Sequence, residues 1–398
     1  MKEKFLRELA DIQTGPFGSQ LHKEDYVADG TPIVTVEHLG NKMFSEQNLP
    51  RVSNTDKNRL KKYVLKQGDI VFSRVGSVDR CSYVDQKHDG WMFSGRCLRV
   101  RPTSEIDSEY LYYYFCLEET KQFVRNISVG ATMPSINTKL LGEVVVTFPE
   151  LEQQKRISGI LSAIDSKIEV NQKINDNLEQ QAVALFKSWF VDFSLFGGTV
   201  PENWEDTTLE NITTLITRGI APKYSDNSDQ TVVNQKCIRN HTIDLSLART
   251  HTPKAINEKW LKFGDLLINS TGDGTLGRVA QVWFAPKALT VDSHVTIVRP
   301  AREELIFYIG LWGILHEKEI ESLHTGSTGQ TELPRDRVKM LKLLLPDDSS
   351  LSRFNSIIAP MTSTIISNQE ENQKLANLRD TLLPKLMSGV IDVANVQL

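Results

Sequence analysis

The stretch IEVNQKINDNLEQ (residues 168–180) decides the fold, because a close copy of it, IISNQEENQKLAN (365–377), follows 197 positions later. Apolar residues in both copies recur three and four positions apart, which is typical of an amphipathic helix. Each copy also places two asparagines among these apolar positions. A helix that occurs twice, with polar residues on its apolar side, predicts two helices that pair with each other.

The similarity between the two halves continues beyond this stretch. QGDIVFSR (67–74) parallels FGDLLINS (263–270), and VGAT (129–132) parallels TGST (325–328), each 196 positions apart. The matches keep their order along the chain, and a period this long excludes a solenoid of short repeats. The sequence therefore predicts two copies of one module, each with a mixed region followed by a helix. The predicted segments are 1–150, 151–198, 199–345 and 346–398.

The two mixed regions are expected to contain short strands and one helical segment each. Stretches such as TPIVTVEHL (31–39) and HVTIVRP (294–300) are rich in β-branched residues and are bounded by turn residues. Residues 108–124 and 304–320 have helical periodicity instead. Their crowded aromatic residues predict core packing rather than a surface for stacking.

The two repeated helices have the pattern of a coiled coil. Strict four–three spacing runs from Ile157 to Trp189 in the first helix and from Phe354 to Leu386 in the second. A buried asparagine weakens such a seam unless it meets another polar group, so the asparagines are expected to fix the register. An antiparallel pair would place them opposite one another, and separate packing of each helix on its own region is the alternative. The register residues are Asn171, Asn175, Asn368 and Asn372.

The length of the first seam predicts a spacer. It spans roughly 50 Å at about 1.5 Å per residue, which corresponds to about 14 base pairs of DNA. A rigid rod between two similar regions suggests two recognition events at a fixed separation on one ligand. Pro360 and Pro384 in the second helix predict a kink or a late start of that helix.

Composition gives no argument for nucleic-acid binding by the chain as a whole, because its net charge is −4. The four cysteines form no C-x-x-C pair and no metal-ligand spacing, which favours a reduced protein. MKEKFLRELADIQTG (1–15) has no apolar core, so we expect no signal peptide. With no apolar run of about 18 residues either, the chain is expected to be soluble and cytoplasmic.

One glycine motif raises the question of a nucleotide site. STGDGTLGRVA (270–280) contains Gly272, Gly274 and Gly277 in the order G-x-G-x-x-G, but a dinucleotide loop opens a helix, whereas a strand-like stretch follows here. A hairpin turn is therefore favoured, and a nucleotide-binding enzyme that uses the Gly272–Gly277 loop is the alternative. The sequence contains no ATP-binding P-loop, no amino-methyltransferase motif and no histidine cluster. We expect no catalytic residues and no metal ligands.

Four segments carry a resemblance to a known family. They are LADIQTGPFGSQL (9–21), PELEQQKRISGILSAIDSKIEVNQ (149–172), LFKSWFVDF (185–193) and NLRDTLLPKLMSGVIDV (377–393). With these segments the chain resembles the specificity (S) subunit of type I restriction–modification systems, over essentially its whole length. The second half departs from the pattern, because LPDDSSLSRF (345–354) lacks the P-x-L-x-E-Q entry of the first half, and Arg379 takes the seam position of Ala182.

The resemblance implies an α+β fold with two pseudo-symmetric mixed target recognition domains, separated by a pair of long antiparallel coiled-coil helices. It also implies that each domain reads one half of a bipartite DNA site and that the helices set the gap. The subunit would be non-catalytic and bind no cofactor directly. Two modification subunits with S-adenosylmethionine would methylate adenine N6, and two restriction subunits with ATP and Mg would translocate and cleave DNA.

Under this interpretation, DNA contacts are expected on paired loops of the two mixed regions. Glycine and serine let the backbone approach phosphates, and Arg74 and Arg80 could reach guanine edges. Solvated surface charges and ordinary turn residues are the alternative for any single side chain. The candidate DNA-binding residues are Ser19, Gln20, Lys23, Lys61, Lys62, Arg74, Arg80, Thr132, Arg218, Lys223, Tyr224, Lys236, Arg239, Arg278, Thr328 and Gln330.

Overall fold

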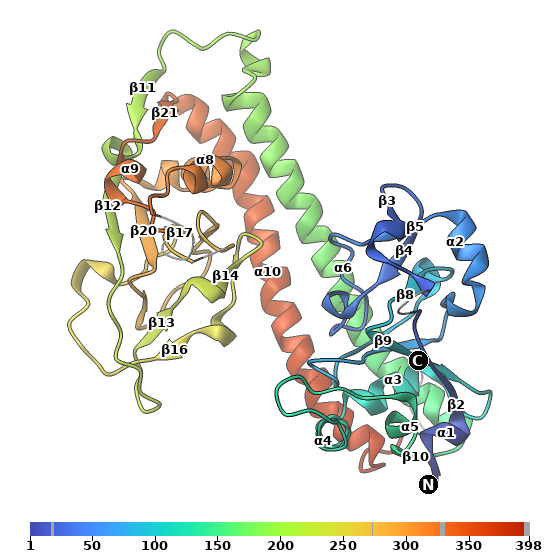
Figure 1. Ribbon diagram of the computed structural model, residues 1–398. Helices are drawn as coiled ribbons and strands as arrows, with labels where there is room; N and C mark the ends of the chain where they lie inside the picture. Colours follow the sequence, from blue (N-terminus) through green and yellow to red (C-terminus); the bar gives the residue numbers. More distant parts are fainter. Residues whose placement is uncertain (17–19, 273, 327–330, 394–398) are drawn as a thin grey trace. The chain divides into compact units, whose positions relative to one another are not determined.

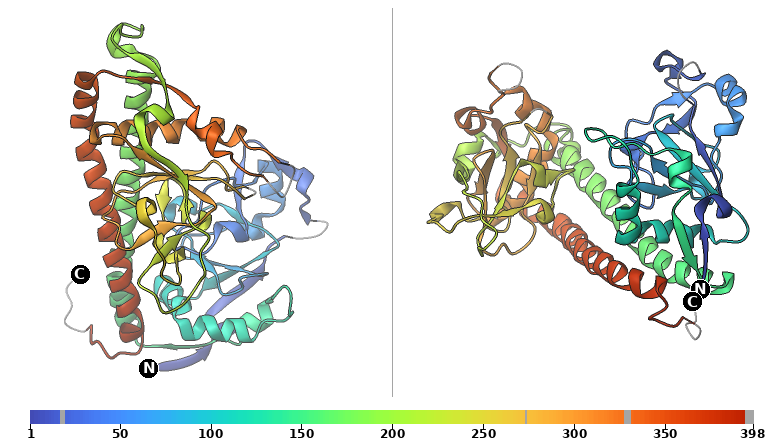
Figure 2. Two further views of the ribbon diagram at one scale, coloured as in Figure 1. Left: turned by 90° about the vertical axis from the view of Figure 1, so that its left-hand side faces the viewer. Right: turned by 60° about the horizontal axis from the view of Figure 1, so that its bottom comes forward.

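The chain forms two compact units, each of which combines a mixed region with one half of each long helix (Figures 1 and 2). The computed structural model describes residues 1–16, 20–272, 274–326 and 331–393, apart from the side chain of Lys23. The first unit comprises Met1–Val170 and Glu371–Leu398, and the second comprises Asn171–Glu370. The expected α+β class, with two mixed regions and a pair of long antiparallel helices, is confirmed.

The first unit is built on two four-stranded sheets. One is antiparallel, in the order β2 (Ala10–Thr14), β9 (Cys97–Pro102), β6 (Ile70–Ser73), β7 (Cys81–Tyr83). The other is mixed, in the order β3 (Tyr26–Val27), β5 (Arg51–Val52), β4 (Thr31–Val34), β8 (Met92–Phe93). Strand β1 (Lys2–Phe5) pairs with β10 (Val145–Phe148). The short helices are α1 (Leu6–Leu9), α2 (Asn54–Arg59), α3 (Ser108–Cys116), α4 (Glu118–Asn126) and α5 (Thr138–Leu141).

The second unit repeats this plan with its own details. Its four-stranded antiparallel sheet has the order β12 (Thr213–Arg218), β20 (Val295–Pro300), β17 (Leu266–Asn269), β18 (Val279–Gln281). A three-stranded sheet has the order β16 (Arg249–Thr250), β13 (Thr231–Val233), β19 (Leu289–Val291). Two strand pairs complete it, β14 (Ile238–Arg239) with β15 (Thr242–Ile243) and β11 (Glu205–Thr208) with β21 (Lys342–Leu345). Its short helices are α7 (Ile306–Leu315), α8 (Glu317–Ser322) and α9 (Arg335–Lys339).

The repeat extends to a buried ion pair in the antiparallel four-stranded sheet of each unit. The guanidinium of Arg101 holds both carboxylate oxygens of Asp69, at 2.6 and 2.7 Å, and Arg299 holds Asp265 in the same way, at 2.8 and 2.7 Å. Asp69 and Asp265 are 1% and 0% exposed. Loss of one partner from such a pair costs about 3–5 kcal/mol, because the other charge stays buried without compensation. Each sheet therefore depends on both members of its pair.

The aromatic residues of the two mixed-region helices pack in the cores, which confirms the interpretation of residues 108–124 and 304–320. Tyr110, Tyr113 and Phe115 of α3 and Tyr308 of α7 are buried. The Tyr110 hydroxyl donates to a carbonyl of β10 (Thr147, 3.1 Å), and the Tyr308 hydroxyl donates to the corresponding carbonyl of β21. Each helix is thus fixed to its strand by an apolar ring with a satisfied polar end.

The long helices α6 (Leu151–Phe190) and α10 (Asp348–Met387) have 40 residues each and run antiparallel. In the first unit, Asp165 accepts a hydrogen bond from Arg379 at 2.8 Å, and Lys167 lies 3.2 Å from Glu371. In the second unit, the rings of Trp189 and Phe354 are 5.6 Å apart. From the first unit to the second, residues further along α6 therefore contact residues that come earlier in α10. The alternative of separately packed helices is therefore wrong.

Helix α10 begins at Asp348, so the late start predicted from Pro360 is wrong. The side chain of Asp347 caps the helix, because its Oδ1 accepts the backbone N–H groups of Ser349 and Ser350, both at 3.0 Å. Its Oδ2 accepts the Trp204 indole N–H at 2.7 Å. Burial raises the pKa of Asp347, but these hydrogen bonds outweigh it and lower the pKa to about 2. The cap satisfies two free N–H groups of the first turn and so stabilises the start of the helix twelve residues before Pro360.

The glycine motif forms the turn between β17 and β18, which pair antiparallel. Gly272, Gly274 and Gly277 have φ values of 98°, 70° and 84°, a region that favours glycine. The interpretation as a hairpin is confirmed. Among the described residues, no helix combines the length and the apolar character needed to cross a membrane.

Candidate nucleic-acid interface

The first group of candidate residues in unit one surrounds Gln20. The Tyr63 hydroxyl donates to Gln20 Oε1 at 2.6 Å, and Arg59 donates to the Gln20 carbonyl at 2.9 Å. Lys61 and Lys62 lie in the same short 3₁₀ turn as Tyr63, and both are exposed. The structure thus brings Gln20 together with two exposed lysines, and the Lys62 ammonium lies 4.8 Å from the centre of the Tyr63 ring. Ser19 and the side chain of Lys23 lie outside the described part of the chain.

The second group in unit one joins the loops that carry Arg74 and Thr132. The Ile136 N–H donates to the Arg74 carbonyl at 2.9 Å, and residues 129–135 close into a narrow loop with Thr132 exposed at its tip. Arg74 also donates to the Gly95 carbonyl at 3.0 Å. Arg80 is placed differently, because its guanidinium donates to the carbonyl of Leu39 within the same unit.

The equivalent group in unit two centres on Arg218. Its guanidinium lies 2.6 Å from the carboxylate of Glu332 and donates to the Leu333 carbonyl at 2.8 Å. The Leu333 N–H donates to the Ser270 carbonyl at 2.8 Å, as Ile136 does to Arg74 in unit one. The candidates Thr328 and Gln330 lie outside the described residues. Arg278, at the end of the glycine hairpin, is half-buried.

The remaining candidates of unit two lie on three separate turns. Lys236 is exposed in a 3₁₀ turn after β13, and Arg239 is exposed on the β14–β15 pair. Lys223 is exposed beside Tyr224, which is 39% exposed. The Arg249 guanidinium lies 3.6 Å from the centre of the Tyr224 ring, a cation–π contact that leaves an aromatic–cationic pair at the surface.

The chain is similar to known proteins over most of its length. A family model described as the type I restriction modification DNA specificity domain matches residues 1–180. The MjaIX specificity subunit of Methanocaldococcus jannaschii is 28% identical over 320 residues, which cover 74% of this chain and 71% of that protein. The HindI specificity subunit of Haemophilus influenzae is 23% identical over 411 residues, covering 83% and 88%. The crystal structure of an M. genitalium type I S subunit has the same fold, with a TM-score of 0.56 at 17% identity, covering 97% and 95%.

Residues 1–180 thus match the type I DNA specificity domain, and the chain as a whole is similar to type I specificity subunits. These similarities do not favour the alternative of a nucleotide-binding enzyme. The structure of the glycine loop agrees, because it joins two strands and opens no helix.

Sequence analysis missed one pair of turn residues beside the candidate loops. Arg96 and His294 are exposed, and their carbonyls accept the backbone N–H groups of Arg74 and Ser270, both at 2.8 Å. Each therefore lies next to the second group of its unit. The sequence signal was available, since the VRP triplets that follow the two residues by a few positions are 198 apart.

His294 belongs to a polar cluster of unit two that also contains Thr271 and Gln235. The Thr271 hydroxyl lies 2.7 Å from His294 Nδ1 and 3.1 Å from Gln235 Oε1. Gln235 Oε1 can only accept, so when the hydroxyl donates to it, His294 Nδ1 is the ring nitrogen that carries a proton and donates to Thr271. This tautomer leaves Nε2 as an acceptor on an exposed ring. Such an acceptor suits the exocyclic amino group of adenine or cytosine.

Proposed function

We propose that this chain is the DNA-recognition subunit of a type I restriction–modification complex and that each unit reads one half of a bipartite double-stranded site. One observation carries the proposal: both units build the same loop arrangement, with the Ile136–Arg74 hydrogen bond in one matched by Leu333–Ser270 in the other. Polar and basic residues lie on these loops in both units. Two equivalent surfaces on one chain suit two short sequences at a fixed distance.

The helix pair sets the gap between the half-sites and docks two modification subunits. Those subunits hold S-adenosylmethionine and methylate adenine N6, and two restriction subunits add Mg- and ATP-dependent translocation and cleavage. The net charge of −4 supports this division, because a chain without a positive balance gains little from phosphate neutralisation alone. The chain itself binds none of these cofactors and works in the cytoplasm, where its DNA is.

Replacement of residues 1–150 by the corresponding region of another specificity subunit tests the bipartite proposal. Methylome sequencing of cells that carry the chimaera with its modification subunits is expected to show one changed half-site and one unchanged half-site. The matched control replaces residues 199–345, which should change the other half-site only. Changes in both half-sites with a single replacement would contradict independent reading by the two units.

A further inference from the structure

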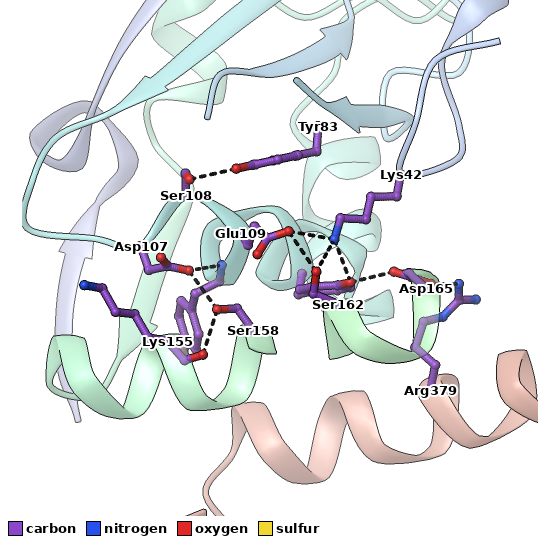
Figure 3. A network of polar contacts seen from close by, with 12 residues as sticks. Lys42, Tyr83, Asp107, Ser108, Glu109, Lys155, Ser158, Ser162, Asp165 and Arg379 are labelled. Atoms are coloured by element: carbon purple, nitrogen blue, oxygen red, sulfur yellow. Dashed lines mark hydrogen bonds and ion pairs between the residues drawn. The ribbon is translucent and has the colours of Figure 1, made fainter. Parts of the chain in front are cut away.

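The first unit contains a polar network centred on the ammonium group of Lys42 (Figure 3). The ammonium donates to Glu109 Oε1 at 2.7 Å, to Ser162 Oγ at 2.8 Å and to the Tyr113 hydroxyl at 3.3 Å. A lysine ammonium has three protons, and each has its own acceptor here. The Lys42 side chain is only 13% exposed, so water competes little for these bonds. The position of the ammonium is therefore defined in three directions.

The network joins the recognition part of the unit to both long helices. Glu109 and Tyr113 belong to α3, whereas Ser162 belongs to α6. The Tyr113 hydroxyl donates to Asp165 of α6 at 2.6 Å, and Asp165 accepts from Arg379 of α10 at 2.8 Å. Burial and the neighbouring carboxylate of Asp165 raise the pKa of Tyr113, which keeps its proton on the hydroxyl as the donor.

The backbone around Lys42 is also held in place. The Tyr83 N–H donates to the Lys42 carbonyl at 2.8 Å. The Ser82 hydroxyl donates to the Asn41 carbonyl at 2.6 Å and accepts the Gly40 N–H at 3.2 Å. The loop is thus fastened to β7 before its side chain reaches α6. A displacement of β7 relative to α6 would break the three bonds of the ammonium together.

The second unit has no counterpart of this network at the equivalent positions, all of which are described. Residues 197 or 198 positions away replace each of the polar partners with an apolar or a neutral side chain: Phe307, Leu311, Ala359, Thr362 and Ala182. Aromatic packing holds that unit to its helix halves instead, with ring centres 5.3 Å apart for Phe186 and Tyr308 and 5.0 Å apart for Phe190 and Tyr308. Apolar packing is non-directional, whereas hydrogen bonds weaken steeply when distance or angle changes.

We propose that Lys42 is a positioning residue that latches the first recognition region to the helix pair and thereby restricts the gap length that the subunit accepts. The inference rests on the proposed bipartite function. The helix pair sets the distance between the two recognition regions, and the Lys42 network sets the orientation of the first region on the helices. When the latch is removed, the first region pivots on its helix halves and can follow a half-site that lies one base pair nearer or farther.

The test is methylome sequencing of cells that carry the full chain with its modification subunits. Lys42→Met is expected to leave both half-sites unchanged and to lower the preference for the native gap over gaps one base pair longer or shorter by about tenfold, which corresponds to about 1.4 kcal/mol. Lys87→Met is the matched control, since Lys87 pairs with Glu46 at the surface of the same unit. It should retain the native preference.

A second variant separates positioning from stability. Lys42→Met leaves the Glu109 carboxylate without its cation, whereas Lys42→Met/Glu109→Gln removes both charges. We expect the double variant to recover thermal stability and still accept the neighbouring gaps. If the native gap preference returns together with the melting temperature, Lys42 is only structural and the inference is overturned.

The remaining outcomes are also decisive. If Lys42→Met abolishes all methylation, Ser162→Ala decides, because it removes a single oxygen from the helix side of the latch and should lower the gap preference by about threefold. An unchanged preference in Ser162→Ala overturns the inference. A wild-type protein that methylates no bipartite site refutes the proposed function itself. A bipartite site whose gap preference survives Lys42→Met refutes the latch alone.

Discussion

The seam between α6 and α10 allows a prediction about a buried polar pair. Asn368 Nδ2 donates to Asn175 Oδ1 at 2.8 Å, and Asn175, which is 8% exposed, donates to the Ile365 carbonyl at 3.4 Å. Asn368→Leu removes the donor to a buried oxygen, which costs about 1–3 kcal/mol. Since position 368 is only half-buried, the leucine recovers part of the roughly 1.5–3 kcal/mol available from full burial. We expect a net loss of about 1–2 kcal/mol.

The double variant Asn175→Leu/Asn368→Leu should behave differently from the sum of the single variants. Both polar groups of this pair are then absent, so neither leaves a buried oxygen without a donor, while Asn171 and Asn372 stay on the seam. We expect stability at or above that of the wild type, with a coupling energy of about 1–3 kcal/mol between the two positions. The double substitution should instead weaken the preference for one register of the helix pair, because a polar seam residue specifies register.

Native-state hydrogen exchange of the amides around residue 175 is the suitable assay, because it reports the local opening free energy without requiring the whole chain to unfold in two states. Gln369→Leu is the matched control, since Gln369 is the exposed neighbour of Asn368. It should change the opening free energy by less than about 0.5 kcal/mol. Additive effects of the two asparagine substitutions would refute the argument that the pair acts as a unit.

Three further predictions follow from other features. Seven residues inserted into both long helices, beside Asn175 and Asn372, should add about 10 Å and so lengthen the gap by about three base pairs in methylome sequencing, whereas an unchanged gap would show that the helices are not the ruler. Asp347→Ala should cost about 1 kcal/mol at neutral pH; because the folded-state pKa is lowered to about 2, this contribution is present above the unfolded pKa and is lost as the pH falls from about 4 towards 2, so melting curves of wild type and variant should converge in acid. Asp265→Ala leaves Arg299 buried without its anion and should cost about 3–5 kcal/mol in chemical denaturation, and a loss below 1 kcal/mol would contradict a structural role for the pair.

The parts of the fold that could be predicted are those encoded by local periodicity and by the repeat. The four–three spacing predicted both long helices. Their contact is seen in the hydrogen bond from Arg379 of α10 to Asp165 of α6. The late start of α10 was wrongly predicted because the proline was weighed without the cap at Asp347, which satisfies two N–H groups of the first turn. Local sequence shows the proline but not the Trp204 side chain that holds the cap, 143 positions away.

The candidate interface was less predictable, because exposure and direction of a side chain depend on contacts that are distant in sequence. Arg80 was a natural candidate in a basic turn, yet it donates to the carbonyl of Leu39, 41 positions earlier. His294 carries no motif, and it becomes a candidate only when Thr271 and Gln235 are seen to fix its tautomer. The DNA-binding residues of both units stay predictions, to be tested by substitution in the full complex.

The two units share the ion pair inside the sheet but differ in how the recognition region is attached to the long helices. The Asp–Arg pair inside each sheet is the same in both, which is expected of a buried pair because the loss of either partner leaves a charge without compensation. The attachment to the helices is free of this constraint, since a polar network and an aromatic cluster can hold a recognition region equally well. The network of unit one depends on directional bonds and charges, whereas the cluster of unit two depends on buried area. Loss of a single donor or charge should therefore act more strongly on the attachment of the first recognition region than on that of the second, so a substitution that loosens the Lys42 network should relax the gap without relaxing either half-site.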